Sequence, residues 1–278
     1  MPAVLRLQGV GLRYGDGPAV LQGIELSLAA GSFHFLSGPT GAGKTSLLRV
    51  ASLAVPPSVG SIELFGRTID KLDRQELATL RQRIGVVFQD FRLLEHLTVF
   101  DNVALPLRIN GADEDETASF VADMLAWLGL ADKLEALPHD LSMGQRQLVC
   151  IARAVVAKPR LLLTDEPTSN IDSRNAGRLM NLFMQLHKLG ATVLLATHSD
   201  ALMDRYPFPI LTMEGGRLVA AEGPRTLEPE PLRPEPAAAG PGRQATGDQA
   251  AENPHAAPGA DAAPAAADVR RPKRSRKR

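Results

Sequence analysis

The stretch that decides the fold is "GPTGAGKT", residues 38–45, which fits the spacing Gly-x-x-x-x-Gly-Lys-Ser/Thr. The apolar run "FHFLS" precedes it and the helix-like "SLLRVASLA" follows it, so the motif stands between a strand and a helix. A glycine-rich turn without further function is the alternative, but this flanking context favours a phosphate-binding loop. The stretch therefore predicts a P-loop near the start of an α/β fold.

The residue types in this loop match the needs of a phosphate chain and its metal ion. Glycines let the backbone curl so that its N–H groups point inward at a helix N-terminus. Lys44 supplies positive charge for the β- and γ-phosphates, and Thr45 supplies a hydroxyl for Mg²⁺. The residues expected to bind the nucleotide here are Gly38, Pro39, Thr40, Gly41, Ala42, Gly43, Lys44, Thr45 and Ser46.

Two adjacent carboxylates end a second apolar run, "LLLTDEP" at residues 161–167. At the tip of a buried strand, Asp165 could hold Mg²⁺ beside Thr45, and Glu166 could polarise an attacking water. A helix-capping Asp–Glu pair before Pro167 is the alternative, and the P-loop upstream makes it the weaker one. The pair therefore predicts hydrolysis of a bound phosphate chain rather than binding alone.

The remaining periodicities place these motifs in an α/β fold. "RIGVVFQ", "RLLLTDEP" and "ATVLLATHS" are short apolar runs ending in polar residues, typical of central parallel strands. "AVLRLQGVGLRY" and "IELSLAAGSFHFLSG" alternate and contain glycine breaks, which predicts antiparallel strands. Residues 114–129 have a helical pattern. We expect a P-loop NTPase core with a mostly parallel sheet, an N-terminal antiparallel β layer and a helical subdomain at about residues 90–145.

Composition and charge exclude several classes of protein. The chain has 278 residues, 44% hydrophobic and 22% charged, with a formal net charge of zero. Residues 1–222 carry 21 Lys and Arg against 24 Asp and Glu, which disfavours a nucleic-acid binder. The single cysteine, Cys150, predicts no internal disulfide, fits a reducing compartment and is expected to be a small core residue. No leader or membrane-spanning run is apparent, so we expect a soluble, cytosolic protein.

The chain changes character at residue 223, which we take as the end of the folded domain of residues 1–222. Residues 223–278 are rich in Pro, Ala and Gly, so they bury little apolar surface and are expected to be disordered. The segment ends in "RRPKRSRKR", which has seven basic residues among nine. A solvated tail end and a polybasic contact with anionic lipid are both consistent with this pattern.

Further motifs, in a fixed order along residues 1 to about 220, carry a resemblance to a known family. "LSMGQRQ" at 141–147 resembles the signature loop of ATP-binding-cassette ATPases, and it shortly precedes the Asp–Glu strand, as it does there. Tyr14 matches the adenine-stacking aromatic of that family, Gln89 its Gln-loop residue and His198 its switch histidine. "SNID" at 169–172 matches the dimer-contact loop. Taken singly, Tyr14 and His198 could be ordinary strand residues.

The resemblance implies a mechanism that uses two copies of the chain. The copies would sandwich two ATP molecules head to tail, and the signature residues of one would meet the γ-phosphate held by Lys44 of the other. Met143 replaces a glycine that is common in this loop, whereas Gly144 is retained. The implied roles are catalysis for Glu166, His198 and Gln89, metal binding for Thr45, Gln89 and Asp165, and nucleotide contact for Tyr14, Ser142, Gly144, Gln145 and Asp172. The implied cofactors are ATP and Mg²⁺.

The apolar stretch "FQDFRLLEHLTVFDNVALPL", residues 88–107, follows the Gln-loop residue. By resemblance it offers a docking surface to a polytopic inner-membrane partner, and its "TVFDNVALPL" is similar to the cell-division branch of the family. This implies a homodimer at the cytoplasmic face of the bacterial inner membrane, coupled to a permease-like partner and not to nucleic acid. Residues such as Leu94 and Val103 are expected to belong to the core of the helical subdomain, and others of the stretch to touch the partner.

Other branches of the family provide the alternatives. ATPases of lipoprotein-release and macrolide-export transporters share the same partner architecture and resemble the chain a little less closely. DNA-repair cassettes are a distant alternative, because they usually carry long coiled-coil or zinc-binding insertions. The single cysteine and the short connections here argue against both kinds of insertion.

Overall fold

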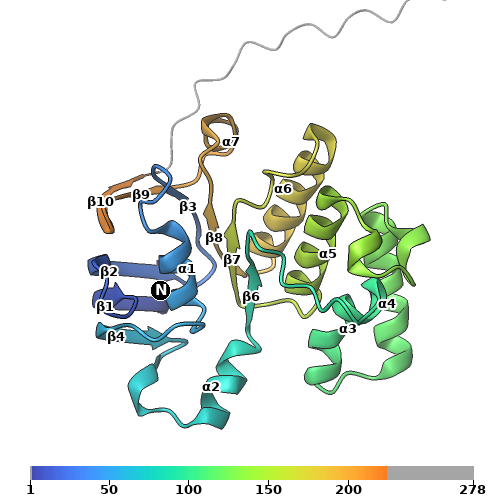
Figure 1. Cartoon of the computed structure of the whole chain (residues 1–278), viewed down its shortest axis with the longest axis horizontal. Helices are drawn as coiled ribbons and strands as arrows, with labels where there is room; N and C mark the ends of the chain where they lie inside the picture. Colours follow the sequence, from blue (N-terminus) through green and yellow to red (C-terminus); the bar gives the residue numbers. More distant parts are fainter. Residues whose placement is uncertain (1, 224–278) are drawn as a thin grey trace, which may run out of the picture. The chain divides into compact units, whose positions relative to one another are not determined.

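A six-stranded sheet forms the centre of the fold in the computed structural model, which describes residues 2–223 (Figure 1). Its strand order is β10-β9-β3-β8-β7-β6, with β6, β7, β8, β3 and β9 parallel and β10 antiparallel to β9. The strands are β3 (Phe33–Ser37), β6 (Ile84–Val87), β7 (Leu161–Asp165), β8 (Thr192–Ala196), β9 (Ile210–Glu214) and β10 (Arg217–Glu222). The α/β fold with a mostly parallel sheet is confirmed.

A second, antiparallel sheet contains most of the N-terminal segment. Its strand order is β2-β1-β4-β5, and its strands are β1 (Ala3–Arg13), β2 (Ala19–Ala29), β4 (Val59–Leu64) and β5 (Arg67–Thr68). The antiparallel prediction is right for residues 3–29 and wrong for Phe33–Ser37, which pairs in parallel with β8 and β9. The reason is burial on both faces, since Phe33, Phe35 and Leu36 are all buried.

Helices cover the central sheet and connect its strands. They are α1 (Lys44–Ala51), α2 (Arg74–Arg81), α3 (Val99–Ile109), α4 (Glu114–Trp127), α5 (Met143–Val155), α6 (Ser173–Lys188) and α7 (Asp200–Arg205), with 3₁₀ turns at Ile69–Lys71, Ala131–Lys133 and Pro138–Asp140. Figure 1 shows α3, α4 and α5 gathered beyond β6 and β7, on the side away from the antiparallel sheet. The helix predicted from residue 114 is present as α4. The boundaries of the helical subdomain and of the folded domain stay predictions.

Two hydrophobic clusters sandwich the central sheet. Leu162 of β7 belongs to the cluster that contains α3 to α6, whereas Leu161 and Leu163 belong to the cluster shared with α1 and the antiparallel sheet. Every residue of β7 and β8 is buried, which explains their continuous apolar runs. Because both faces are covered, the polar residues that follow each strand lie at the sheet edge, where a ligand can reach them.

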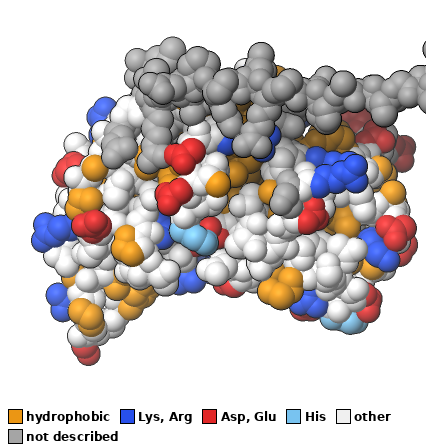
Figure 2. All heavy atoms as spheres, turned by 90° about the horizontal axis from the view of Figure 1, so that it is seen from above, with side chains coloured by type: hydrophobic (Ala, Val, Ile, Leu, Met, Phe, Trp, Pro, Cys, Tyr) orange, Lys and Arg blue, Asp and Glu red, His pale blue; other side chains and the backbone are white. Residues whose placement is uncertain are grey.

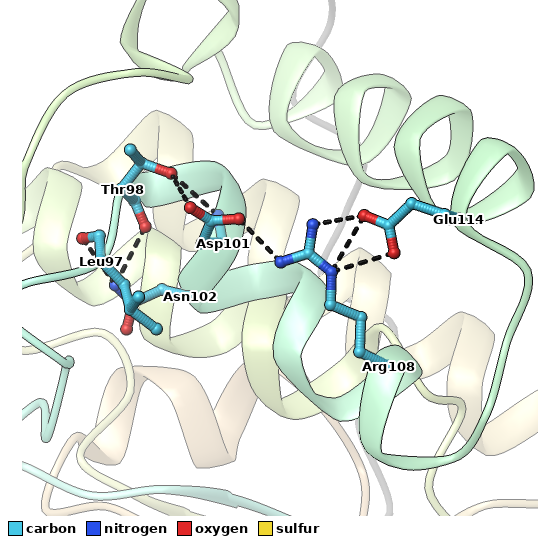
Figure 3. Close-up of polar contacts among 6 residues, drawn as sticks. All are labelled: Leu97, Thr98, Asp101, Asn102, Arg108 and Glu114. Atoms are coloured by element: carbon cyan, nitrogen blue, oxygen red, sulfur yellow. Dashed lines mark hydrogen bonds and ion pairs between the residues drawn. The ribbon is translucent and has the colours of Figure 1, made fainter.

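A polar clamp joins the start of α3 to the start of α4 (Figure 3). Arg108 Nη1 donates to Asp101 Oδ1 at 2.7 Å, and Arg108 Nε donates to Glu114 Oε1 at 3.0 Å. The hydrogen bond from Arg108 holds the pKa of Asp101 below its usual range. Thr98 caps α3, since its hydroxyl accepts from the amide of Asp101. Arg108 therefore links acidic groups in the first turns of α3 and α4, where negative charge is favoured, and so fixes the two helices to each other.

Within residues 2–223, no helix combines the length and the apolar character that crossing a membrane requires. The expectations for a disordered, basic tail fall on residues outside the described part of the chain, apart from Gly223. Cys150 lies in the core, as predicted, and its burial raises the pKa of the thiol to about 12.

Candidate functional site

The P-loop lies between β3 and α1 and is shaped by glycines whose positive φ angles other residues rarely adopt. Gly38 has φ +142°, and a Cβ there would lie 2.3 Å from the carbonyl oxygen of Met213. Gly43 has φ +103° and precedes the first residue of α1. Lys44 folds back over the loop and donates from Nζ to the carbonyl oxygens of Gly38 and Pro39. The ammonium group and the N-terminus of α1 thus converge on one place, which suits an anion.

A cavity of about 340 Å³ lies over this loop. It brings together the P-loop, the end of β7, the second residue after β6 and the segment after β8. Its lining residues are Val20, Thr40, Gly41, Ala42, Gly43, Lys44, Thr45, Ser46, Gln89, Asp165, Glu166 and His198. Residues predicted from four separate motifs therefore share one cavity.

The oxygen atoms at the inner end of the cavity fit a magnesium ion. Thr45 Oγ1 donates to Asp165 Oδ2 at 2.6 Å, and Asp165 is only 2% exposed. Burial raises the pKa of Asp165, so an ionised carboxylate there gains from a nearby cation. Gln89 lines the same cavity and offers an amide oxygen. Hydroxyl, carboxylate and amide oxygens form the hard donor set that Mg²⁺ prefers.

Glu166 is held in an unusual conformation at the tip of β7. Its φ is +49°, a left-handed value that is uncommon outside glycine, and such strain concentrates at functional sites. Its Oε1 lies 2.7 Å from His198 Nδ1, and the hydroxyl of Thr197 donates to its Oε2 at 3.4 Å. The side chain of Glu166 is 13% exposed, whereas that of His198 is 73% exposed. The carboxylate is thus oriented from two sides and faces the cavity.

Tyr14 lies beside the first turn of α1, outside the residues that line the cavity. Tyr14 is 42% exposed, and its hydroxyl lies 3.4 Å from Ser46 Oγ. An exposed aromatic face next to a phosphate-binding loop can stack on a base. The adenine-stacking role remains a prediction.

The signature and dimer-contact residues lie apart from this cavity in the chain itself. Ser142 and Gln145 form a capping box at the start of α5, and Asp172 caps α6 through the amide of Asn175. A Cβ on Gly144 would lie 2.9 Å from the carbonyl oxygen of Asn170, so these two loops are in contact. None of the four predicted residues Ser142, Gly144, Gln145 and Asp172 lines the cavity over Lys44. Their predicted contact with a nucleotide stays a prediction.

Two residues near the site were missed by sequence reasoning. Thr197 orients Glu166, and Arg153 hydrogen-bonds the backbone just after Gln89. A polar residue next to the predicted switch histidine could have drawn attention to Thr197. Arg153 lies 64 positions from Gln89, and no spacing in the sequence links them.

Comparison with known proteins is consistent with this geometry. The ABC transporter family profile matches residues 21–169. The cell division ATP-binding protein FtsE of Escherichia coli K12 is 41% identical over 220 residues, covering 79% of this chain and 99% of that protein. The FtsE protein of Haemophilus influenzae is 42% identical over 205 residues, covering 74% and 94% of the two chains.

A solved structure shows the same fold. The dimeric, post-hydrolysis ATP-binding cassette MJ0796, bound to ADP and Pi, superposes with a TM-score of 0.74 and 29% identity, covering 80% of this chain and 99% of that chain. The family profile, the relatives and the fold all indicate an ATP-binding protein, which is consistent with the cavity over the P-loop. The chain belongs to the ABC transporter family and is an ABC-type ATPase similar to FtsE.

Proposed function

We propose that the chain binds ATP with Mg²⁺ in the cavity over the P-loop and hydrolyses it as a head-to-tail homodimer. The observation that carries this proposal is the convergence of Lys44, the Thr45–Asp165 pair and the oriented Glu166 on one cavity. Lys44 and the loop amides bind the phosphates, and Tyr14 stacks on the adenine. Thr45, Asp165 and Gln89 would hold Mg²⁺, which would neutralise charge on the phosphate oxygens.

Glu166 is placed to act on the attacking water. Its carboxylate accepts a proton or orients the water by hydrogen bonding, and Thr197 and His198 hold it in position. His198 is mostly exposed, so its second ring nitrogen is free to reach the γ-phosphate or the partner copy. The left-handed backbone of Glu166 turns its side chain toward the cavity rather than along the strand.

A second copy would complete the site. Ser142, Gly144 and Gln145 stand at the N-terminus of α5, where backbone N–H groups favour an anion. These residues miss the cavity of their own chain, and the structure similar to this one is described as dimeric. Met143 is 61% exposed at this helix end, which suits a contact across the dimer interface.

The membrane partner has a candidate docking site in a groove between α2, β6, α3 and α5. We call this cavity, of about 430 Å³, the docking groove. Its apolar wall consists of Ala78, Ile84, Val86, Leu105, Pro106, Ile109, Ala154, Ala157 and Pro159. A neighbouring cavity that shares Ile109 adds the exposed cations Arg83, Lys158 and Arg160. An apolar segment that carries acidic residues would complement this surface.

The docking groove revises the interpretation of residues 88–107. Val103 is fully buried, and Leu93 is 9% exposed within the core. Leu94 is 37% exposed, so its assignment to the core was wrong. Residues 91–97 are irregular rather than helical, which places adjacent leucines in different environments. The end of the stretch, at Leu105 and Pro106, reaches the groove.

In this proposal the partner is a polytopic inner-membrane protein of the FtsX type, and the ATPase acts in cell division at the cytoplasmic face of the membrane. The similarity to FtsE supports this choice. Lipoprotein-release and macrolide-export ATPases remain the alternative. Acidic and basic side chains are interspersed on the face shown in Figure 2, which does not favour a nucleic-acid partner.

Purification of the tagged, full-length protein from solubilised membranes tests the proposed function. We expect a polytopic protein with FtsX-like topology to co-purify. Removal of that protein should lower the rate of ATP hydrolysis. Co-purification with a lipoprotein-release or macrolide-export permease would select the alternative. Enrichment of ribosomes or DNA instead would contradict the proposal.

The basic end of the tail yields a separate prediction. If "RRPKRSRKR" contacts anionic lipid, deletion of residues 223–278 should weaken binding to anionic liposomes by about 1 kcal/mol per basic residue at low salt. The loss should shrink as salt rises, because exposed charges are screened over about 8 Å at physiological ionic strength. Nucleotide binding is the control and should not change. Equal liposome binding with and without the tail would leave it a solvated appendage.

A further inference from the structure

The backbone just after Gln89 is held in a strained turn. Phe91 has φ +54° and Arg92 has φ +51°, two consecutive left-handed residues of which neither is glycine. Such a turn persists only when the surrounding structure holds it. The turn follows Gln89 by two residues, so any relaxation of it would move the Gln89 side chain relative to the cavity.

Helix α5 supplies the groups that hold this turn. Arg153 Nη2 donates to the carbonyl oxygen of Phe91 at 3.0 Å, and Arg153 Nη1 donates to that of Arg92 at 2.7 Å. Cys150, one helical turn earlier, donates from Sγ to the same Phe91 oxygen at 2.9 Å. A planar guanidinium can bind two neighbouring acceptors at once, which a lysine ammonium does less well. Both strained residues are therefore tied to α5 by one arginine.

The other end of the loop is fixed by a buried asparagine on α3. Asn102 is fully buried; its Oδ1 accepts from the amide of Leu94 at 2.9 Å and its Nδ2 donates to the carbonyl of Leu94 at 3.0 Å. It also donates to the carbonyl oxygens of Leu97 and Thr98, as Figure 3 shows. Arg153 Nη1 lies 3.5 Å from Asn102 Oδ1. The segment is thus clamped at both ends, and Arg153 acts on the end nearer to Gln89.

We infer that Arg153 is a positioning residue that holds Gln89 in the nucleotide cavity by locking the Phe91–Arg92 turn to helix α5. Helix α5 begins beside Ser142, about 16 Å along its axis from Arg153. Arg153 also lines the docking groove. The placement of Gln89 therefore depends on the helix that starts at the signature loop and borders the groove. This inference rests on the proposed contact between Gln89 and Mg²⁺.

The test replaces Arg153 by Met, which keeps the aliphatic stem and removes all donors, in full-length protein carrying Glu166→Gln to suppress turnover. Equilibrium binding of a fluorescent ATP analogue is measured with EDTA and with increasing Mg²⁺. We expect unchanged affinity in EDTA, because the P-loop is intact, and an Mg²⁺ half-saturation raised about 10-fold, as for other residues that orient a metal ligand. Arg153→Lys, which retains a donor, should lie between. Hydrogen exchange at residues 88–94 should rise in step.

Arg108→Met is the matched control, because it removes an arginine that also joins two segments, Asp101 of α3 and Glu114 of α4 (Figure 3). It should lower thermal stability without changing the Mg²⁺ half-saturation. Equal shifts for Arg108→Met and Arg153→Met would mean that any loosening of these helices has this effect, and would overturn the inference. If Arg153→Met does not fold, Arg153→Lys and Arg153→Gln take its place in the comparison.

A double-mutant cycle with Gln89→Ala separates the inference from the function on which it rests. If Arg153 acts through Gln89, the double variant should need no more Mg²⁺ than Gln89→Ala alone. Additive shifts would overturn the inference, as would a shift for Gln89→Ala with none for Arg153→Met. No shift for Gln89→Ala itself would instead remove Gln89 from the metal site.

Discussion

Glu166→Gln should retain ATP and lose about 10²–10⁴-fold in turnover, the range that a general base or water-positioning carboxylate typically contributes. The amide keeps the size of the side chain but cannot accept a proton from water. Thr197 and His198 contact the two oxygens of the carboxylate, and the amide replaces one of these oxygens by nitrogen. Binding should be preserved because Lys44, Thr45 and Asp165 are untouched. Release of phosphate and equilibrium binding of ATP, measured on the same purified protein, check both halves.

The control for this prediction is Glu63→Gln, which removes an equally charged group from an exposed pair with Arg6 on the antiparallel sheet. Its turnover should stay near that of the unchanged protein, since surface ion pairs contribute little. Because ATP is retained, the Glu166→Gln protein should also accumulate as an ATP-bound dimer in size-exclusion chromatography. A turnover near the unchanged rate, with the membrane partner present, would remove Glu166 from the catalytic site.

Much of the site could be predicted from sequence because its motifs carry their chemistry locally. The P-loop needs residues with special backbone angles. At position 38, φ is +142° and a Cβ would lie 2.3 Å from a carbonyl oxygen, so glycine is required there. Asp165 ends a fully buried strand and Glu166 follows it, so both lie where the strand leaves the sheet. Parallel strand order then places them beside Thr45 without any further information.

What could not be predicted depends on contacts between distant segments. "FHFLS" follows an alternating segment and is predicted to be antiparallel with it, yet it pairs in parallel with β8 on one side and β9 on the other. Leu93 and Leu94 look alike in sequence, and the irregular path of residues 91–97 decides which one is exposed. Arg153 is one of several arginines in α5 and its surroundings, and its role follows only from a turn that no sequence pattern announces.

A charge placed in the docking groove should separate the ATPase from its membrane partner. Ile109 is 58% exposed and lines both the docking groove and its basic neighbour, so Ile109→Glu should fold normally. The new carboxylate would be desolvated by an apolar partner segment and would compete with that segment's acidic groups for Arg83 and Lys158. Loss of one well-packed contact of this kind costs about 2 kcal/mol or more, so co-purification should fall by at least about 10-fold.

Two further variants decide how this result is interpreted. Leu189→Glu places the same charge on an apolar residue that is 80% exposed at the end of α6, and it should keep the partner. Leu93→Glu buries a carboxylate in the core and should cost at least about 3 kcal/mol of stability, which separates misfolding from lost docking. If Ile109→Glu binds ATP, folds and still retains the partner as well as Leu189→Glu does, the groove between α2, β6, α3 and α5 is not where the membrane protein docks.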